Sequence, residues 1–146
     1  MSLSGGCQCG AVRFRAGRLG RASICHCRMC QKAFGGFFGP YVDAFELEWT
    51  RGAPTYFESS NKARRGFCPD CGTQLSFEAG GSPPNVAIGA FDHPQDIAPT
   101  MQIGLDAKLP YVDHLADLPH RPAEEAAKLT GYYAAVVSRQ HPDHDT

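Results

Sequence analysis

The sequence lacks any long apolar run and any strong excess of charge of one sign. Of its 146 residues, 42% are hydrophobic and 20% are charged, and the formal net charge is −1. A membrane-spanning helix needs about 20 consecutive apolar residues, and no stretch here approaches that length, so we expect no membrane span. The near-neutral charge provides no long-range attraction to nucleic acid, so we expect no nucleic-acid partner.

The N-terminus also lacks the apolar core of a secretory signal, and the chain shows no internal repeat apart from its cysteine motifs. We therefore expect a cytoplasmic protein. A chain of 146 residues is long enough for one domain with a hydrophobic core of its own.

No cysteine lies outside three short motifs, although the chain contains seven. The motifs are a C-x-C pair (Cys7, Cys9), a C-x-C-x-x-C triplet (Cys25, Cys27, Cys30) and a C-x-x-C pair (Cys68, Cys71). An odd number excludes complete disulfide pairing, and cysteines one residue apart have poor geometry for a bridge. In a cytosolic chain such clusters favour metal ligands over disulfides.

The spacing favours one closed metal site and one open one. A C-x-x-C knuckle supplies two thiolates to one ion, and the C-x-C pair on an extended segment can supply two more. The triplet would then hold a second ion with three thiolates, leaving one position for water or substrate.

Spacing alone leaves other arrangements open. The C-x-C pair could join Cys25 and Cys27, which would leave Cys30 with the last pair. All seven cysteines could also be structural, with His26 as the eighth ligand. We expect instead that His26 points away from the two cysteines beside it, because neighbouring residues of an extended segment face opposite sides. Sulfur ligands at the triplet would also accept iron.

Alternating apolar and polar residues, separated by Gly- and Pro-rich turns, predict a mainly β fold. The expected strands are residues 11–15, 37–42, 45–49, 55–58, 73–78 and 86–91. A short helix is expected from Arg28 to Phe34, ended by Gly35 and Gly36. A longer helix is expected over residues 123–139, with Pro122 at its start.

The C-terminal part is expected to be an addition to one main domain. Residues 1–120 should form the zinc-binding β domain, and residues 121–140 should form a helix that packs on it. The packing face would be an apolar stripe of Leu129, Tyr132, Tyr133, Val136 and Val137. The polar residues 141–146 are expected to form a disordered tail.

The motifs, in their order along the chain, carry a resemblance to a known family. They are Gly6-Cys7-Gln8-Cys9-Gly10, Cys25-His26-Cys27-Arg28-Met29-Cys30 and Arg65-Gly66-Phe67-Cys68-Pro69-Asp70-Cys71-Gly72. Over roughly residues 3–120 the sequence resembles the glutathione-dependent formaldehyde-activating enzymes, a family that includes centromere protein V. The resemblance implies a β-tent fold of packed antiparallel sheets stapled by zinc.

The resemblance also implies two zinc ions with separate roles. The structural zinc would be bound by Cys7, Cys9, Cys68 and Cys71, and the catalytic zinc by Cys25, Cys27 and Cys30. The implied activity is that of a carbon-sulfur lyase: it adds glutathione, as co-substrate, to formaldehyde and forms S-hydroxymethylglutathione.

The residues themselves agree with such chemistry. A thiol bound at an open metal position loses its proton, and the resulting thiolate is a nucleophile for an aldehyde. Arg28, Lys32 and Arg65 flank the motifs and are our candidates for binding the carboxylates of glutathione. Asp92, in an Asp-His-Pro segment, is expected to serve a turn rather than proton transfer. A zinc-stapled binding module without catalysis, and a redox or metal-handling protein, are the alternative functions.

Overall fold

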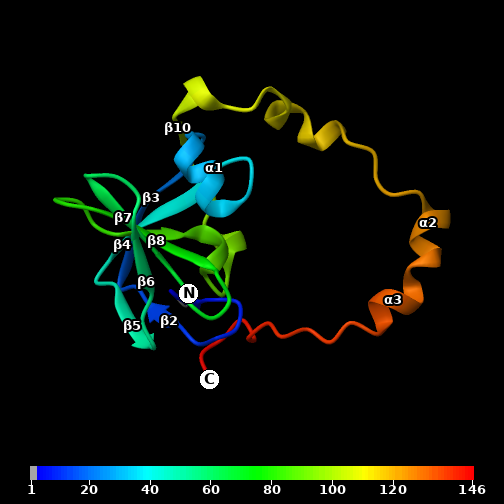
Figure 1. Ribbon diagram of the computed structural model, residues 1–146, viewed down its shortest axis with the longest axis horizontal. Coiled ribbons are helices and arrows are strands. Elements are labelled where there is room, and N and C mark those ends of the chain that lie inside the picture. The colour runs from blue at the N-terminus through cyan, green and yellow to red at the C-terminus, as the bar shows by residue number, and fades with distance from the viewer. Residues whose placement is uncertain (1–2) are drawn as a thin grey trace.

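The computed structural model describes residues 3–146 and is mainly β (Figure 1). The strands are β1 (Ser4–Gly6), β2 (Arg13–Arg15), β3 (Arg18–Cys25), β4 (Gly39–Phe45), β5 (Glu48–Arg51), β6 (Thr55–Glu58), β7 (Ala63–Phe67), β8 (Gln74–Ala79), β9 (Asn85–Ala87) and β10 (Met101–Ile103). The mainly β prediction is therefore confirmed.

The strands form two sheets that share one core. The smaller sheet has the order β1-β2-β5, and the larger has the order β10-β3-β4-β9-β8-β7-β6. Paired neighbours run antiparallel, apart from β10, which runs parallel to β3. Phe14 of the small sheet is fully buried, and its ring meets those of Trp49 and Phe91 at centroid distances of 5.8 and 5.0 Å. The same buried cluster includes Val42 and Leu75 of the large sheet.

Each of the six predicted strands overlaps an observed one, but the predicted strand 45–49 lies across the turn between β4 and β5, where Glu46 has φ 54°. The predicted strand 55–58 matches β6, and the predicted strand 73–78 differs from β8 by one residue at each end. The predicted strand 86–91 stops early, because the chain turns at Ile88–Ala90 into the 3₁₀ helix η1. The missed strands are β1, β3, β7 and β10, among which β3 and β7 each contain two arginines.

The predicted short helix is present with the expected bounds, as α1 (Arg28–Phe34). Cys27 caps its N-terminus, and Gly35 ends it in the left-handed region at φ 60°. The helix lies close to the start of β4: a Cβ atom on Gly39 would come within 2.9 Å of the Phe34 ring and 3.0 Å of Cys30. This close approach fixes the position of Cys30 against the large sheet.

The C-terminal segment differs from its prediction. The 3₁₀ helices η3 (Leu105–Ala107) and η4 (Pro110–Asp117) are followed by α2 (Ala123–Lys128) and α3 (Thr130–Ala134), which replace the single helix expected over 123–139. This segment forms an arm that leaves the β domain and returns to it (Figure 1). Tyr132 and Val137 are 68% and 85% exposed, so the predicted packing of the stripe on the domain is absent. Neither α2 nor α3 contains a buried residue.

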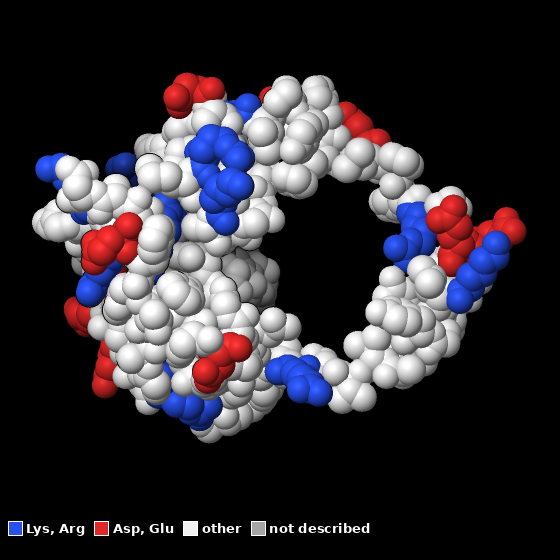
Figure 2. All heavy atoms as spheres, viewed as in Figure 1, with Lys and Arg blue, Asp and Glu red and all other residues white. Residues whose placement is uncertain are grey.

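Both ends of the arm are anchored on the β domain. Before the arm, β10 is fixed by pairing with β3. After the arm, the tail is bound to the small sheet, so residues 105–140 must bridge the gap between these two anchors. The space-filling view shows the opening that the arm surrounds, and positive and negative side chains intermixed on this face (Figure 2). Within residues 3–146, no helix has the length and apolar composition needed to cross a membrane.

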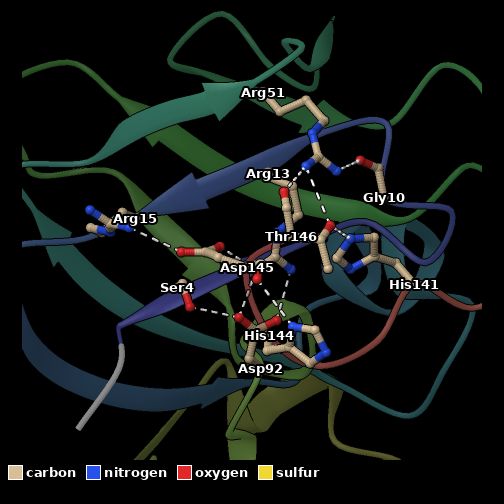
Figure 3. A network of polar contacts seen from close by, with 10 residues as sticks. All are labelled: Ser4, Gly10, Arg13, Arg15, Arg51, Asp92, His141, His144, Asp145 and Thr146. Atoms are coloured by element: carbon tan, nitrogen blue, oxygen red, sulfur yellow. Dashed lines mark hydrogen bonds and ion pairs between the residues drawn. The ribbon is translucent and has the colours of Figure 1, made fainter.

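The tail, residues 141–146, is docked rather than disordered. The backbone N–H of His141 donates to the carbonyl of Gln8 at 2.7 Å. The carboxylate of Asp145 accepts from Arg13 at 2.6 Å and from Arg15 at 3.0 Å (Figure 3). The expectation of a disordered tail considered its polar composition alone and missed the arginines of β2 that face it.

Candidate metal centres

The cysteines, which are spread over 65 positions of the sequence, gather in the fold at two places. Within each group the Sγ atoms lie within 4.8 Å of one another. The first group has four members, Cys7, Cys9, Cys68 and Cys71, and the second has three, Cys25, Cys27 and Cys30. The partition in which Cys30 joins the last pair is not the one observed.

Two turns build the four-cysteine group, one between β1 and β2 and the other between β7 and β8. The Sγ atoms of Cys7 and Cys9 are 3.6 Å apart, and those of Cys9 and Cys68 are 3.9 Å apart. Four thiolates about 2.3 Å from a tetrahedral zinc lie roughly 3.8 Å from one another, so the donor set fits that ion. Gly72 continues the second turn at φ 78°, a conformation that a side chain would disfavour.

The thiols of this group differ in acidity. Burial raises the pKa of Cys68 to about 12. Burial also acts to raise the pKa of Cys71, but hydrogen bonding to Thr73, whose Oγ1 lies 3.2 Å from the sulfur, brings it down to about 6. The backbone N–H of Gln8 donates to the same hydroxyl at 2.9 Å, which joins the two turns.

The three-cysteine group lies where β3 passes into α1. Cys25 is the last residue of β3, Cys27 caps α1, and Cys30 is buried in the first turn of the helix. β10 supports this junction from one side: the N–H of His26 donates to the carbonyl of Ile103 at 2.9 Å. Chain connectivity and the edge strand together hold the three sulfurs near one another.

His26 does not belong to this group. Its side chain is 1% exposed, and Nε2 lies 2.9 Å from Oε1 of Gln102 on β10. The ring also meets Phe38 edge to face. Among residues 3–146, no histidine, aspartate or glutamate contributes a ligand atom to the triplet. The expectation that His26 turns away from the cysteines beside it agrees with this placement.

Arg65 of β7 contacts the triplet directly. It is 4% exposed, and its Nη2 lies 3.5 Å from the Sγ of Cys30. Its Nη1 donates to the hydroxyl of Tyr41 and its Nε to the hydroxyl of Ser59, each at 2.9 Å. Burial raises the pKa of Cys30 to about 12, and the nearby guanidinium acts in the opposite direction. Burial also raises the pKa of Tyr41, so its phenol stays neutral.

A cavity of about 650 Å³ lies between α1 on one side and β6, β7, β8 and the turn at Gly72 on the other. It is lined by Arg28, Met29, Lys32, Ala33, Phe57, Ser59, Arg65, Phe67, Gly72 and Gln74. The three cationic residues expected to bind substrate therefore share one cavity. The apolar wall was not predicted: Met29 and Phe57 are 53% and 64% exposed. Both side chains are exposed because α1 and β6 turn them toward the cavity. The only sequence signal for this wall was that Met29 lies inside the cysteine motif.

Asp92 serves a different region. Its carboxylate receives hydrogen bonds from both terminal nitrogens of Arg13, at 2.8 and 2.7 Å, and from the hydroxyl of Ser4 at 2.6 Å (Figure 3). It lines a small cavity with Cys7 of the four-cysteine group. These contacts agree with a structural role rather than with proton transfer at the triplet.

Two comparisons with known proteins concern the fold and the family of this chain. A crystal structure of a Rhodobacter sphaeroides protein is similar to 68% of this chain and 98% of its own, with a TM-score of 0.53 and 23% sequence identity. At that identity the similarity shows the fold alone. Residues 2–106 match the profile described as glutathione-dependent formaldehyde-activating enzyme. Because the match covers well over half of the sequence, the chain belongs to the glutathione-dependent formaldehyde-activating enzyme family.

Proposed function

We propose that this protein is a zinc-dependent carbon-sulfur lyase that adds a thiol such as glutathione to an aldehyde such as formaldehyde. The observation that carries the proposal is a group of three sulfurs without a fourth ligand among residues 3–146. Arg65, which contacts the sulfur of Cys30, also lines the cavity with the cationic side chains. A zinc ion bound there would supply a Lewis acid with one position for a substrate thiolate. Zinc at the four-cysteine group would be structural.

The cavity supports an anionic thiol as substrate. Arg28 and Lys32 are one helical turn apart on α1 and line it from the same side. Glutathione carries two carboxylates, and these cations would attract both of them. Met29 and Phe57 add an apolar wall to the same cavity. We assign Arg28 and Lys32 to carboxylate binding and place the reaction in the cytoplasm, where thiols remain reduced.

The proposal is tested by measuring metal content and catalysis on the same preparation. Two zinc ions per chain are expected, of which a chelator removes one readily. The protein should accelerate the exchange between free formaldehyde and its glutathione adduct in an NMR exchange experiment. The Cys30→Ser variant should retain one zinc and lose the acceleration.

A matched pair of substitutions tests the substrate assignment. Arg28→Ala and Lys32→Ala should each raise the KM for glutathione about tenfold, the value of one lost charge-assisted contact, and should change kcat little. Lys62→Ala removes a surface cation outside this cavity and is the control. Wild-type protein with two bound zinc ions but no acceleration for any thiol and aldehyde would favour the binding-module alternative.

A further inference from the structure

We propose that Arg65 is a positioning residue of the three-cysteine group: it offsets the negative charge of the thiolates and holds the sulfur of Cys30, rather than binding substrate. The inference rests on the proposed function only in requiring a metal ion at the triplet. It replaces the role in carboxylate binding that the sequence suggested for this arginine.

Each of the three guanidinium nitrogens already has a partner, so three of the five N–H donors are in use. Nε and Nη1 donate to Ser59 and Tyr41, and Nη2 points to Cys30. The Cζ atom of the guanidinium lies 4.9 Å from the centroid of the Phe77 ring. A substrate carboxylate normally binds arginine through two parallel N–H groups. Here the residue is only 4% exposed, so a substrate carboxylate has little access to any pair of its N–H groups.

The other deeply buried arginine shows what Arg65 lacks. Arg13 is 3% exposed, and its charge is balanced by Asp92 and Asp145. Within residues 3–146, Arg65 has no carboxylate at ion-pair distance, and its two oxygen partners are neutral hydroxyls. Leaving a buried cation without a counter-charge is strongly unfavourable. The sulfur of Cys30 is therefore the group that can supply the negative charge.

The net charge of a metal site at the triplet also favours a cation beside it. Three thiolates and one divalent ion sum to −1, and the fixed charge of Arg65 brings this sum to zero. A neutral site accepts a further anion, such as a substrate thiolate, more readily than a site that is already negative, and the difference grows in a low-dielectric interior. Partners around a metal ligand also orient it, and their loss costs about 10- to 100-fold in metal affinity.

The decisive experiment measures metal affinity at each group separately, without using activity. Cobalt(II) is loaded into the full chain, its sulfur-to-metal charge-transfer bands are recorded, and chelator competition gives the affinity of each site. Arg65→Met should lose about 10- to 100-fold in affinity at the triplet and shift its charge-transfer band, while the four-cysteine site is unchanged. Arg65→Lys keeps the charge and should lose clearly less affinity than Arg65→Met.

Arg64 provides a matched control. It is the preceding residue of the same strand, but it is largely exposed and pairs with Glu78 at 2.8 Å. Arg64→Met should leave both cobalt sites unaltered. Circular dichroism reports whether each variant folds. Arg65→Gln, which also removes the charge, carries the test with the same expected loss at the triplet if Arg65→Met does not fold.

Several results would overturn the inference. One is a triplet affinity in Arg65→Met within twofold of wild type. Another is an equal loss of affinity at both groups, and a third is a loss in Arg65→Lys as large as in Arg65→Met. A rise in the KM for glutathione with unaltered cobalt binding would restore the carboxylate-binding role. Wild-type protein that binds cobalt at the triplet without accelerating the reaction would contradict the proposed function and leave the role of Arg65 intact.

Discussion

The two cysteine groups use the same ligand chemistry in different surroundings. The group of four joins two turns, and the arginine beside it is balanced by carboxylates. The group of three joins a strand to a helix, and its arginine contacts a sulfur instead. A complete ligand set, beside an arginine whose charge is balanced, favours a permanently bound metal ion. An incomplete set, beside an arginine without a carboxylate partner, suits an exchangeable anionic ligand at the metal.

The largest expected difference between the groups is in folding. Cys68→Ser removes a ligand that links two distant turns, and zinc binding at a structural site contributes on the order of 10 kcal/mol to folding. We expect this variant to be largely unfolded at 25 °C by circular dichroism. Cys30→Ser should fold and bind one zinc ion instead of two. Equal collapse of both variants would mean that both groups are structural.

A second comparison concerns the buried arginine beside the group of four. Asp92→Asn leaves Arg13 with the more exposed Asp145 as its remaining carboxylate partner. Breaking a buried pair on one side costs about 3–5 kcal/mol. Urea denaturation should show this loss with the triplet's metal affinity unchanged. A variant as stable as wild type would show that the pair contributes little to the scaffold.

The pH dependence of stability follows from the same carboxylate. Burial acts to raise the pKa of Asp92, but hydrogen bonds from Arg13 and Ser4 outweigh it and leave the pKa below its usual value. Since the folded-state pKa is lower than the unfolded one, this stabilisation is complete above about pH 4 and is lost as the pH falls further. Urea midpoints between pH 6 and pH 3 should therefore decrease, and the decrease should be smaller in Asp92→Asn.

The smallest expected effect is that of the docked tail. Asp145→Asn weakens contacts at a carboxylate that is 43% exposed, and such pairs contribute about 1 kcal/mol or less. The thermal midpoint should fall by a few degrees at most, with both metal sites retained. Asp143→Asn, on the same tail, is the control, since it forms no ion pair among the described residues. A loss of metal from the group of four would instead make the tail part of that site.

The local features of this protein were predictable from sequence, and the long-range ones were not. α1 was predicted to the residue because Gly35 and the cysteine motif mark both of its ends. β7 was missed because an arginine inside a short polar segment gives no apolar alternation. The sequence pattern also gave no sign that Arg65 of this strand is buried, and in the fold it is buried against Cys30. The arm after β10 was mispredicted because an apolar stripe indicates a face to be covered without indicating what covers it.

The sequence by itself determined the ligand chemistry, because the spacing of cysteines within each motif decides which sulfurs can turn toward the same point. Only the tertiary structure decided which motifs combine, since the two pairs come from turns far apart in the chain that pairing of the strands brings together. It also decided the roles of the two buried arginines, because a charge acquires its function from the groups that lie against it once water is excluded.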